Sequence, residues 1–410
     1  MKELLSVDTI ETAWEKIIAA TQGWQLETEL LEIRKAAGRI LAQDISAPDN
    51  VPGFRRSTVD GYALHSADTA AAGDSIPVLL KLRGYVEMGK AAAFPVNRGE
   101  CAYVPTGAMI PDSADAVVMI EFTENTDENT VAIYEPAAVG KNIAQAGEDM
   151  RIGEKALSKG SCLRPQEIGL LASLGIGQVT VFKKLKLALF STGNELAAID
   201  ENLSPGRIHD INTPALAALA EQRGYSTIIQ QIIPDEPALL EKALRGSLNS
   251  ADVIVVSGGS SRGGKDYTEQ VFLHITETSI FTRGLALKPG KPSIFGYDKA
   301  SNTLLCGLPG HPVSAFIVFE LFLSRLCRHF SFQPEPLPVP AHIDRNIAAS
   351  PGKTNCQPVV LRPGNETLIA EPVFGKSGMI STLTRADAYV IIEQNKEGLK
   401  KGELVWAYRF

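Results

Sequence analysis

The chain has 410 residues, of which 44% are apolar and 21% are charged, and its formal net charge at pH 7 is −7. This length favours about two to four domains over a single compact fold, and the composition is typical of a globular protein rather than a disordered one. The acidic balance argues against a nucleic-acid partner, because neutralising a phosphate backbone requires a surplus of basic residues.

Cysteine usage and the N-terminal sequence indicate the compartment. The five cysteines are scattered, without the short spacings of zinc or redox motifs, and we expect buried free thiols. The first residues lack the basic start and the apolar core of a signal peptide. The longest apolar run, residues 315–323, is interrupted by Glu320 and is too short to span a bilayer. We therefore expect a cytoplasmic protein with no membrane partner.

The first half of the chain predicts a helix followed by a β-rich lobe. Asp8 and Glu11 have the spacing of an N-terminal capping pair, and apolar residues then recur at helical spacing. Residues 40–133 alternate β-branched runs with glycine-containing turns, which is typical of a β-rich region. A short helix is expected over residues 165–174, because proline is favoured at the first helical position.

The second half alternates strands and helices, which predicts a sheet covered by helices on both faces. The expected strands are residues 185–190, 227–233, 252–256 and 303–306, and the expected helices are residues 214–223, 237–248 and 312–328. Prolines at alternate positions of residues 333–340 then predict an extended linker. Short alternating stretches in residues 341–410 predict a small β domain at the end of the chain.

Three loops that follow expected strands are candidates for binding an anion. Residues 257–266 contain four glycines and three serines, so that successive backbone N–H groups can surround an anion. Residues 190–196 offer hydroxyls, a glycine and Glu195, which is a hard oxygen ligand suited to Mg²⁺. Residues 307–312 open a helix, whose free N–H groups favour anions. Because ligands of open α/β sheets bind beyond the carboxyl ends of strands, we expect a phosphorylated small molecule. Flexible connections or surface turns are the alternatives.

Several charged residues are also candidates. Lys288 and Lys291 flank a Pro-Gly turn, where they can contact phosphate or lie in solvent. His311 is as consistent with a structural role as with donation to phosphate. The acidic candidates are Asp60, Asp149, Asp235 and Asp266. Each of these aspartates taken singly is more typical of a turn or a helix cap than of a metal site.

Taken in order, these stretches resemble those of the molybdopterin molybdenumtransferase family (MoeA type), to which the E domain of gephyrin is similar. The stretches that carry the resemblance are residues 57–63, 105–108, 114–118, 140–143, 147–149, 191–196, 206–210, 257–259, 266–267, 288–292, 308–315, 377–379 and 385–387. Each motif alone is weak, but their number and order make the resemblance specific, and it covers nearly the whole chain.

The resemblance implies a multidomain α/β protein. Its central α/β/α domain would be similar to molybdopterin adenylyltransferase, with an inserted β-rich lobe and a C-terminal β-barrel. The expected domains are residues 1–48 with 141–181, residues 49–140, residues 182–332 and residues 333–410. The resemblance further implies a homodimer.

The resemblance also implies an activity, namely the insertion of molybdate into adenylylated molybdopterin with Mg²⁺-dependent release of AMP, which forms molybdenum cofactor. Tungstate is an open alternative to molybdate. The implied catalytic residues are Asp60, Asp149, Asp266, Lys288 and Lys291, the first two from the side of the lobe and the partner subunit. The implied substrate contacts are Ser57, Thr192, Gly193, Ser257, Gly258, Gly259, Pro309, Gly310, His311, Pro312 and Ser377. The implied Mg²⁺ ligands are Glu195, Asp235 and Asp266.

Two positions depart from the family pattern, and two other functions compete. Many relatives have asparagine at the position of His311. Some have a basic residue at the position of Gly284, and the neighbouring Arg283 can take the place of that basic residue. A molybdopterin adenylyltransferase would share the central α/β domain but not the lobe and the last domain. A scaffold similar to gephyrin would carry a further N-terminal domain and a long linker, neither of which is present in this sequence.

Overall fold

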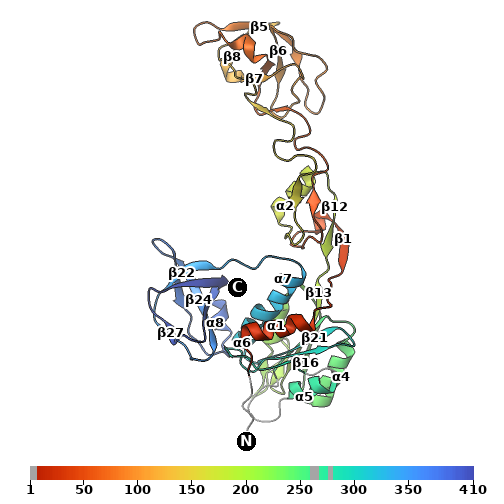
Figure 1. Cartoon of the computed structure of the whole chain (residues 1–410), viewed down its shortest axis with the longest axis vertical. Coiled ribbons are helices and arrows are strands. Elements are labelled where there is room, and N and C mark those ends of the chain that lie inside the picture. Colours follow the sequence, from red (N-terminus) through yellow and green to blue (C-terminus); the bar gives the residue numbers. More distant parts are fainter. Residues whose placement is uncertain (1–6, 259–266, 276–279) are drawn as a thin grey trace. The chain divides into compact units, whose positions relative to one another are not determined.

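The computed structural model describes residues 7–258, 267–275 and 280–410. The chain divides into two compact units (Figure 1). Leu30–Thr180 forms the lobe unit, and Met1–Glu29 with Val181–Phe410 forms the main unit. In the part of the chain that the structure describes, no helix combines the length and the apolar character needed to cross a bilayer.

The lobe unit contains a six-stranded sheet in the order β7-β4-β6-β5-β9-β8. Its strands are β4 (Gly61–Leu64), β5 (Val78–Tyr85), β6 (Glu100–Val104), β7 (Ala116–Met119), β8 (Thr123–Asp127) and β9 (Thr130–Ile133). Neighbouring strands are antiparallel except for the parallel pair β5 and β6. Buried side chains alternate between two clusters, one on each face of the sheet. The β-rich character predicted for residues 40–133 is confirmed.

The remainder of the lobe unit consists of short elements. The strands are β1 (Thr28–Glu32), β2 (Ile45–Ser46), β3 (Arg56–Ser57), β10 (Ile143–Ala144), β11 (Lys155–Leu157) and β12 (Gln178–Phe182), which pair as β1–β12, β2–β11 and β3–β10. The helices are η1 (Ile33–Lys35), η2 (Ser66–Thr69), η3 (Ile120–Phe122) and α2 (Pro165–Ser173). Helix α2 begins at Pro165 as predicted, and Gly175 follows its end in the left-handed region with a φ of 71°.

The main unit is built on a second six-stranded sheet in the order β16-β13-β17-β21-β20-β18. Its strands are β13 (Leu185–Thr192), β16 (Tyr225–Ile233), β17 (Val253–Ser257), β18 (Thr282–Arg283), β20 (Ile294–Asp298) and β21 (Thr303–Leu308). The first four strands in this order are parallel, and β20 and β18 run antiparallel to their neighbours. The four parallel strands are those expected from residues 185–190, 227–233, 252–256 and 303–306.

Helices cover both faces of this sheet, which explains its continuous apolar strands. Side chains of β17 alternate between the two faces: Val253 and Val255 pack in one core, Ile254 and Val256 in the other. The first core includes α1 (Ile10–Ala20), α3 (Asn212–Gln222), α6 (Pro312–Val318), the π-helix η4 (Phe319–Ser324) and α7 (Arg325–Phe330). The second includes α4 (Pro237–Ser247) and α5 (Tyr267–Ile275), which lie together in Figure 1. The expected α/β/α architecture is confirmed.

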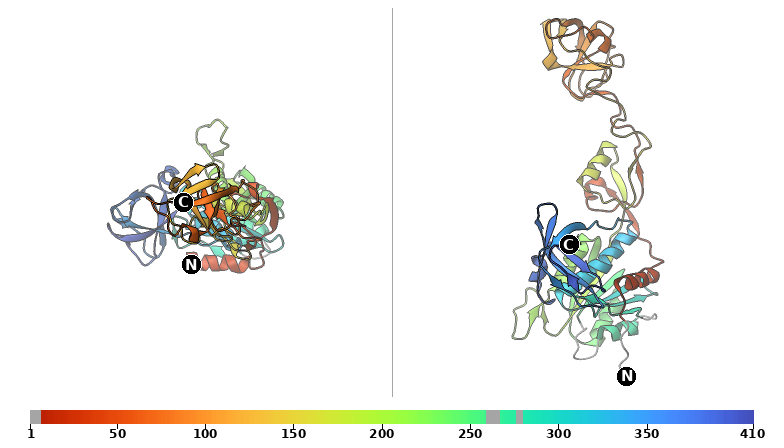
Figure 2. Two further views of the ribbon diagram at one scale, coloured as in Figure 1. Left: turned by 90° about the horizontal axis from the view of Figure 1, so that it is seen from above. Right: turned by 60° about the vertical axis from the view of Figure 1, so that its left-hand side comes forward.

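The end of the chain folds into a closed barrel of five strands, drawn in blue in Figure 2. The strands are β22 (Val339–Ile343), β24 (Thr354–Pro363), β25 (Leu368–Pro372), β26 (Ala388–Ile392) and β28 (Leu404–Arg409). Pairing of β24 with both β25 and β26 closes the barrel. Three shorter elements accompany it: β23 (Ile347–Ala348), β27 (Gly398–Leu399) and α8 (Ser381–Thr384). Strand β19 (Leu287–Lys288) pairs with β24, which joins the barrel to the α/β domain.

The start of α1 differs from the prediction. Thr9, not Asp8, is the N-cap residue, and its hydroxyl accepts a hydrogen bond from the backbone N–H of Thr12 at 3.1 Å. The Asp8 carboxylate instead accepts from Lys16 Nζ at 2.7 Å and from Thr282 Oγ1 at 2.8 Å. A tertiary ion pair therefore replaces the local capping interaction that the sequence suggested.

Thiol accessibility gives a test of the core. Burial raises the pKa values of the Cys101, Cys327 and Cys356 thiols to about 12 and raises the pKa of Cys306 further. Partial burial also raises the pKa of Cys162, but this residue is exposed to a reagent. We expect an aromatic disulfide reagent at pH 8 to label one thiol of the native protein, and all five after denaturation. Rapid labelling of a second thiol in the native protein would contradict the described packing. So would an unchanged level of native labelling in a Cys162→Ser variant.

Candidate functional site

A cavity of about 540 Å³ lies beyond the carboxyl ends of β13 and β17. Strand β13 lies between β16 and β17, so the connections leaving this point run in opposite directions across the sheet. Such a switch point is the usual ligand position in an open α/β sheet. We call this the strand-end cavity. Its lining includes Ser191, Thr192, Glu195, Leu196, Ile208, His209, Asp210, Ile211, Asn212, Asp235, Ser257, Gly258, Tyr267, Pro292, Pro309, Gly310, His311, Pro312 and Gly378.

The ends of β13 and β17 approach each other closely at Gly258. This residue has a φ of +112°, and a Cβ atom built on it would lie 2.5 Å from the carbonyl oxygen of Thr192. Only glycine meets both conditions without strain. The Thr192 hydroxyl is buried and has no hydrogen-bond partner among the described residues. A buried hydroxyl without a partner at a cavity wall is suited to contact a polar ligand.

Gly258→Ala should lower both stability and ligand binding. The added Cβ would clash with the Thr192 backbone, and alanine disfavours the positive φ of this position. We therefore expect the free energy of unfolding to fall by about 2 kcal/mol, measured by urea denaturation. Gly402→Ala is the matched control, since Gly402 has a φ of +83° but open space around its Cβ position. An equal loss in both variants would show that the close approach to Thr192 is unimportant.

Two of the three expected metal ligands, Glu195 and Asp235, line the strand-end cavity. The Glu195 carboxylate lies over Gly193, and a Cβ built on that glycine would be 2.7 Å from both carboxylate oxygens. Asn194 accepts a hydrogen bond from the backbone N–H of Asp235 at 3.1 Å, which holds the two loops together. Asp266 and Gly259 lie outside the described residues. Within the described ranges, no group of three or more His, Cys, Asp or Glu residues is arranged to hold a metal.

A second cavity, of about 660 Å³, lies between the Lys288 turn and the barrel. Lys288, Lys291, Lys353 and Lys376 line it, and no Asp or Glu is among its described lining residues. We call it the lysine cavity. The Thr382 hydroxyl at its wall is buried and has no partner within the described part of the chain. Four ammonium groups without a facing carboxylate favour an anionic ligand.

The two cavities share the residues Pro292, Pro309 and His311. His311 Nδ1 lies 2.8 Å from Ser377 Oγ, and the backbone N–H of Val313 donates to the Ser377 carbonyl at 3.1 Å. Ser377 therefore contacts the first turn of α6, where the sequence predicted a free anion site. The barrel supplies part of this shared wall.

Three expected site residues belong to the lobe unit. Ser57 is buried, and its hydroxyl donates to the carbonyl of Val59 at 2.5 Å. Asp60 is exposed and accepts from the backbone N–H of Thr106 at 2.7 Å. Asp149 is also exposed. The structure does not relate these residues to the two cavities of the main unit, so their roles stay predictions.

Several polar residues of the cavities were not identified as site residues from the sequence. Asp210 and Asn212 lie at the start of α3, and Lys353, Lys376 and Thr382 belong to the barrel. The stretch 206–210 contributed to the resemblance, but nothing in its pattern pointed to a role. Arg283, considered as a replacement for a basic residue at Gly284, pairs with Glu269 at 2.6 Å and lines neither cavity.

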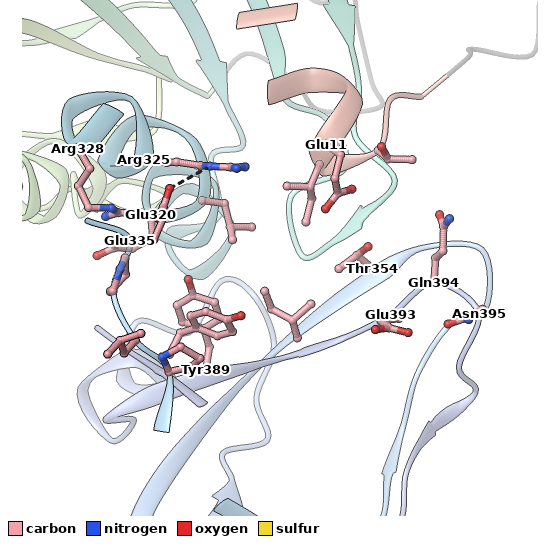
Figure 3. Close-up of a pocket in the computed structure, with 18 residues that line it drawn as sticks. Glu11, Glu320, Arg325, Arg328, Glu335, Thr354, Tyr389, Glu393, Gln394 and Asn395 are labelled. Carbon is pink, nitrogen blue, oxygen red and sulfur yellow. Dashed lines mark hydrogen bonds and ion pairs between the residues drawn. The ribbon is translucent and has the colours of Figure 1, made fainter. Parts of the chain in front are cut away.

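A third cavity, of about 710 Å³, lies between α1, α7 and the barrel (Figure 3). It is larger than the other two, and its described charged lining residues are four glutamates and two arginines: Glu11, Glu320, Glu335, Glu393, Arg325 and Arg328. Glu335 contacts Arg325 at 3.4 Å and Arg328 at 3.3 Å, and Glu320 accepts from Arg223 Nε at 2.8 Å. Because both lining arginines contact Glu335 and the glutamates are in excess, this cavity is a weaker candidate for an anionic ligand.

Comparison with known families covers most of the chain. The MoeA N-terminal region (domain I and II) matches residues 8–175, a probable molybdopterin binding domain matches residues 188–329, and the MoeA C-terminal region (domain IV) matches residues 340–410. The molybdopterin molybdenumtransferase of Haemophilus influenzae is 32% identical over 92% of this chain and 93% of its own length. That of Bacillus subtilis is 29% identical over 93% and 89%, respectively.

Solved structures agree with the sequence relatives. The molybdopterin biosynthesis MoeA protein from Pyrococcus horikoshii OT3 superimposes with a TM-score of 0.84 and is 29% identical, covering 99% of this chain and 100% of that chain. The order of domains, the central sheet and the terminal barrel thus all have counterparts in one architecture. The chain belongs to the MoeA family.

Proposed function

We propose that this protein is a molybdopterin molybdenumtransferase, which inserts molybdate into adenylylated molybdopterin and releases AMP. The observation that carries the proposal is the pair of cavities with a shared wall. The strand-end cavity offers hydroxyls and carboxylates, whereas the lysine cavity offers positive charge. Two adjoining cavities of this kind can hold a phosphorylated pterin and an oxyanion side by side.

The strand-end cavity would hold the pterin and its pyrophosphate. The unpartnered Thr192 hydroxyl and the close backbone approach at Gly258 support a phosphate contact at this position. We propose the same phosphate-binding role for Ser257, Gly310 and Pro312, which line the strand-end cavity, and for Gly193, which directly follows Thr192 in the chain. Gly259 is proposed from the resemblance alone.

The lysine cavity would hold molybdate. A tetrahedral dianion is stabilised by several ammonium groups at once, and Lys288 and Lys291 lie nearest in the chain to the shared wall residue Pro292. In this position they would also screen the negative charge of the pyrophosphate. Tungstate has the same shape and charge, so these contacts favour neither oxyanion.

Mg²⁺ fits the carboxylates of the strand-end cavity. Mg²⁺ in phosphate-binding sites typically takes one or two carboxylates and completes its coordination with substrate phosphates and water. Glu195 and Asp235 would supply this pair, with Asp266 as the third proposed ligand. When bound, the ion would neutralise charge on the pyrophosphate. The chain's own contribution is to hold the pyrophosphate against the Thr192 and Gly258 wall. Hydrolysis of the phosphoanhydride bond would consume one water and release AMP, and the oxygens that the pterin thiolates displace from molybdate would leave as water.

The remaining expectations are part of the same proposal. We propose a homodimer in which Asp60 and Asp149 approach the substrate from the lobe's side and the partner subunit, with Ser57 as a further contact. Ser377, which lies against His311, would contact the substrate from the barrel. The division into residues 1–48 with 141–181, 49–140, 182–332 and 333–410 is proposed as the domain structure.

AMP release tests this function directly. The purified protein would be incubated with adenylylated molybdopterin and Mg²⁺, with molybdate, with tungstate or with neither. We expect AMP release that depends on an oxyanion. A parallel reaction with molybdopterin and ATP tests the adenylyltransferase alternative by pyrophosphate release. No oxyanion-dependent AMP release would refute the proposal, and pyrophosphate release in the parallel reaction would favour the alternative.

A further inference from the structure

Asn212 links three separate segments around the strand-end cavity. It is the first residue of α3 and is 8% exposed. Its side-chain Nδ2 donates to Ser257 Oγ at 2.7 Å and to the carbonyl oxygen of Gly310 at 2.8 Å. The Gly310 carbonyl can only accept, which fixes the orientation of the Asn212 amide. One side chain therefore joins the end of β17 to the loop before α6.

Asp210 holds Asn212 in this position. The Asp210 carboxylate, which is 6% exposed, accepts from the backbone N–H of Asn212 at 3.0 Å and of Thr213 at 3.3 Å. It thereby caps α3. The same oxygen accepts from Ser191 Oγ at 2.9 Å, which connects α3 to β13. The start of α3 is thus anchored to one strand end and reaches across to the next.

The segments that Asn212 joins form the wall proposed to hold phosphate. A Cβ built on Gly310 would lie 3.5 Å from the Cα of Gly258, and the Gly258 N–H donates to the Leu308 carbonyl at 3.2 Å. The Gly310 loop is therefore in contact with Gly258, which is itself tied to the end of β21. The two hydrogen bonds from Asn212 connect the same two segments.

We propose that Asn212 is a positioning residue for the transferase reaction, setting the spacing between the Ser257 and Gly310 segments so that the Thr192 and Gly258 wall fits a substrate phosphate. The inference rests on the proposed function. Asn212 acts through Ser257 and Gly310, and its removal weakens substrate binding more than it slows the chemical step, because the carboxylates proposed to hold Mg²⁺ lie in other loops.

Four variants separate positioning from simple packing. Asn212→Ala removes the amide. Asn212→Asp keeps its size but cannot donate to Gly310 and adds a negative charge. Ser257→Ala removes one partner, and the double variant Asn212→Ala/Ser257→Ala tests whether the two residues act together. Asn346→Ala is the matched control, since it loses one hydrogen bond, from the Lys401 N–H at 2.8 Å, and lines neither cavity.

The measurements are the kinetics of AMP release and the binding of inorganic pyrophosphate by calorimetry. We expect Asn212→Ala to raise KM for adenylylated molybdopterin about 10-fold while kcat changes less than about threefold, as loss of two hydrogen bonds predicts. Asn212→Asp should be at least as impaired. The double variant should raise KM less than the product of the two single effects. Pyrophosphate affinity should fall in parallel, and the control should match wild type.

The outcomes distinguish the two proposals. Wild-type turnover with an unchanged KM in Asn212→Ala or in Asn212→Asp would overturn the positioning role, as would fully multiplicative effects in the double variant. An inactive wild type that still binds pyrophosphate, with weaker binding in the variants, would overturn the proposed function but support the role of Asn212 in setting the spacing of the phosphate-binding wall. Should Asn212→Ala fail to fold, Asn212→Asp and Ser257→Ala allow the same comparison.

Discussion

Glu195→Gln should slow Mg²⁺-dependent AMP release by about 100-fold, because it removes the charge of a proposed metal ligand while keeping its shape. The effect should be measured in steady-state assays over a range of Mg²⁺ concentrations. Part of the loss should be recovered at high Mg²⁺, since a weakened site fills when the ion is abundant. Asp235→Asn should behave in the same way, as both carboxylates line the strand-end cavity.

Glu236→Gln is the matched control for these carboxylates. Glu236 is exposed, follows Asp235 directly and does not line the strand-end cavity. Its replacement should leave both the rate and the Mg²⁺ dependence unchanged. If Glu195→Gln retains wild-type activity at limiting Mg²⁺, the metal site lies elsewhere.

The double variant Lys288→Ala/Lys291→Ala should raise KM for molybdate by about 100-fold, because each ammonium contact to a dianion is worth about a factor of ten. Raising the NaCl concentration should weaken molybdate use by wild type more than by the double variant, since exposed charges are screened by salt. The assay is AMP release at varied molybdate and fixed adenylylated molybdopterin.

Lys400→Ala/Lys401→Ala provides a control with the same change in net charge. These exposed lysines lie on the turn before β28 and line neither the strand-end cavity nor the lysine cavity. Equal losses in both double variants would indicate a general effect of charge rather than a molybdate contact.

The sequence predicted local features well because they depend on neighbouring residues. An apolar run followed by glycine and hydroxyl residues marks a strand end, and Thr192 and Ser257 indeed lie at strand ends and line the strand-end cavity. The N-cap of α1 was predicted wrongly, because Asp8 and Thr9 both suit this position. The long-range partner Lys16, which the local pattern does not reveal, engages Asp8.

The composition of the lysine cavity could not be predicted in the same way. Lys288 faces the barrel because Leu287 pairs with Thr354 and Lys288 with Asn355, more than sixty positions along the chain. This pairing brings Lys353 to the cavity, and no periodicity in the sequence encodes it. Asn212 was missed for a related reason, since its amide acts on residues of two distant loops.

The wall shared by the strand-end cavity and the lysine cavity has a thermodynamic consequence. His311 lines both cavities and contacts Ser377 of the barrel, so a ligand that moves His311 in one cavity alters the other. The coupling free energy between two sites is reciprocal. If pterin occupancy tightens oxyanion binding by a given factor, the oxyanion must tighten pterin binding by the same factor, and each ligand would help to retain the other until both are consumed.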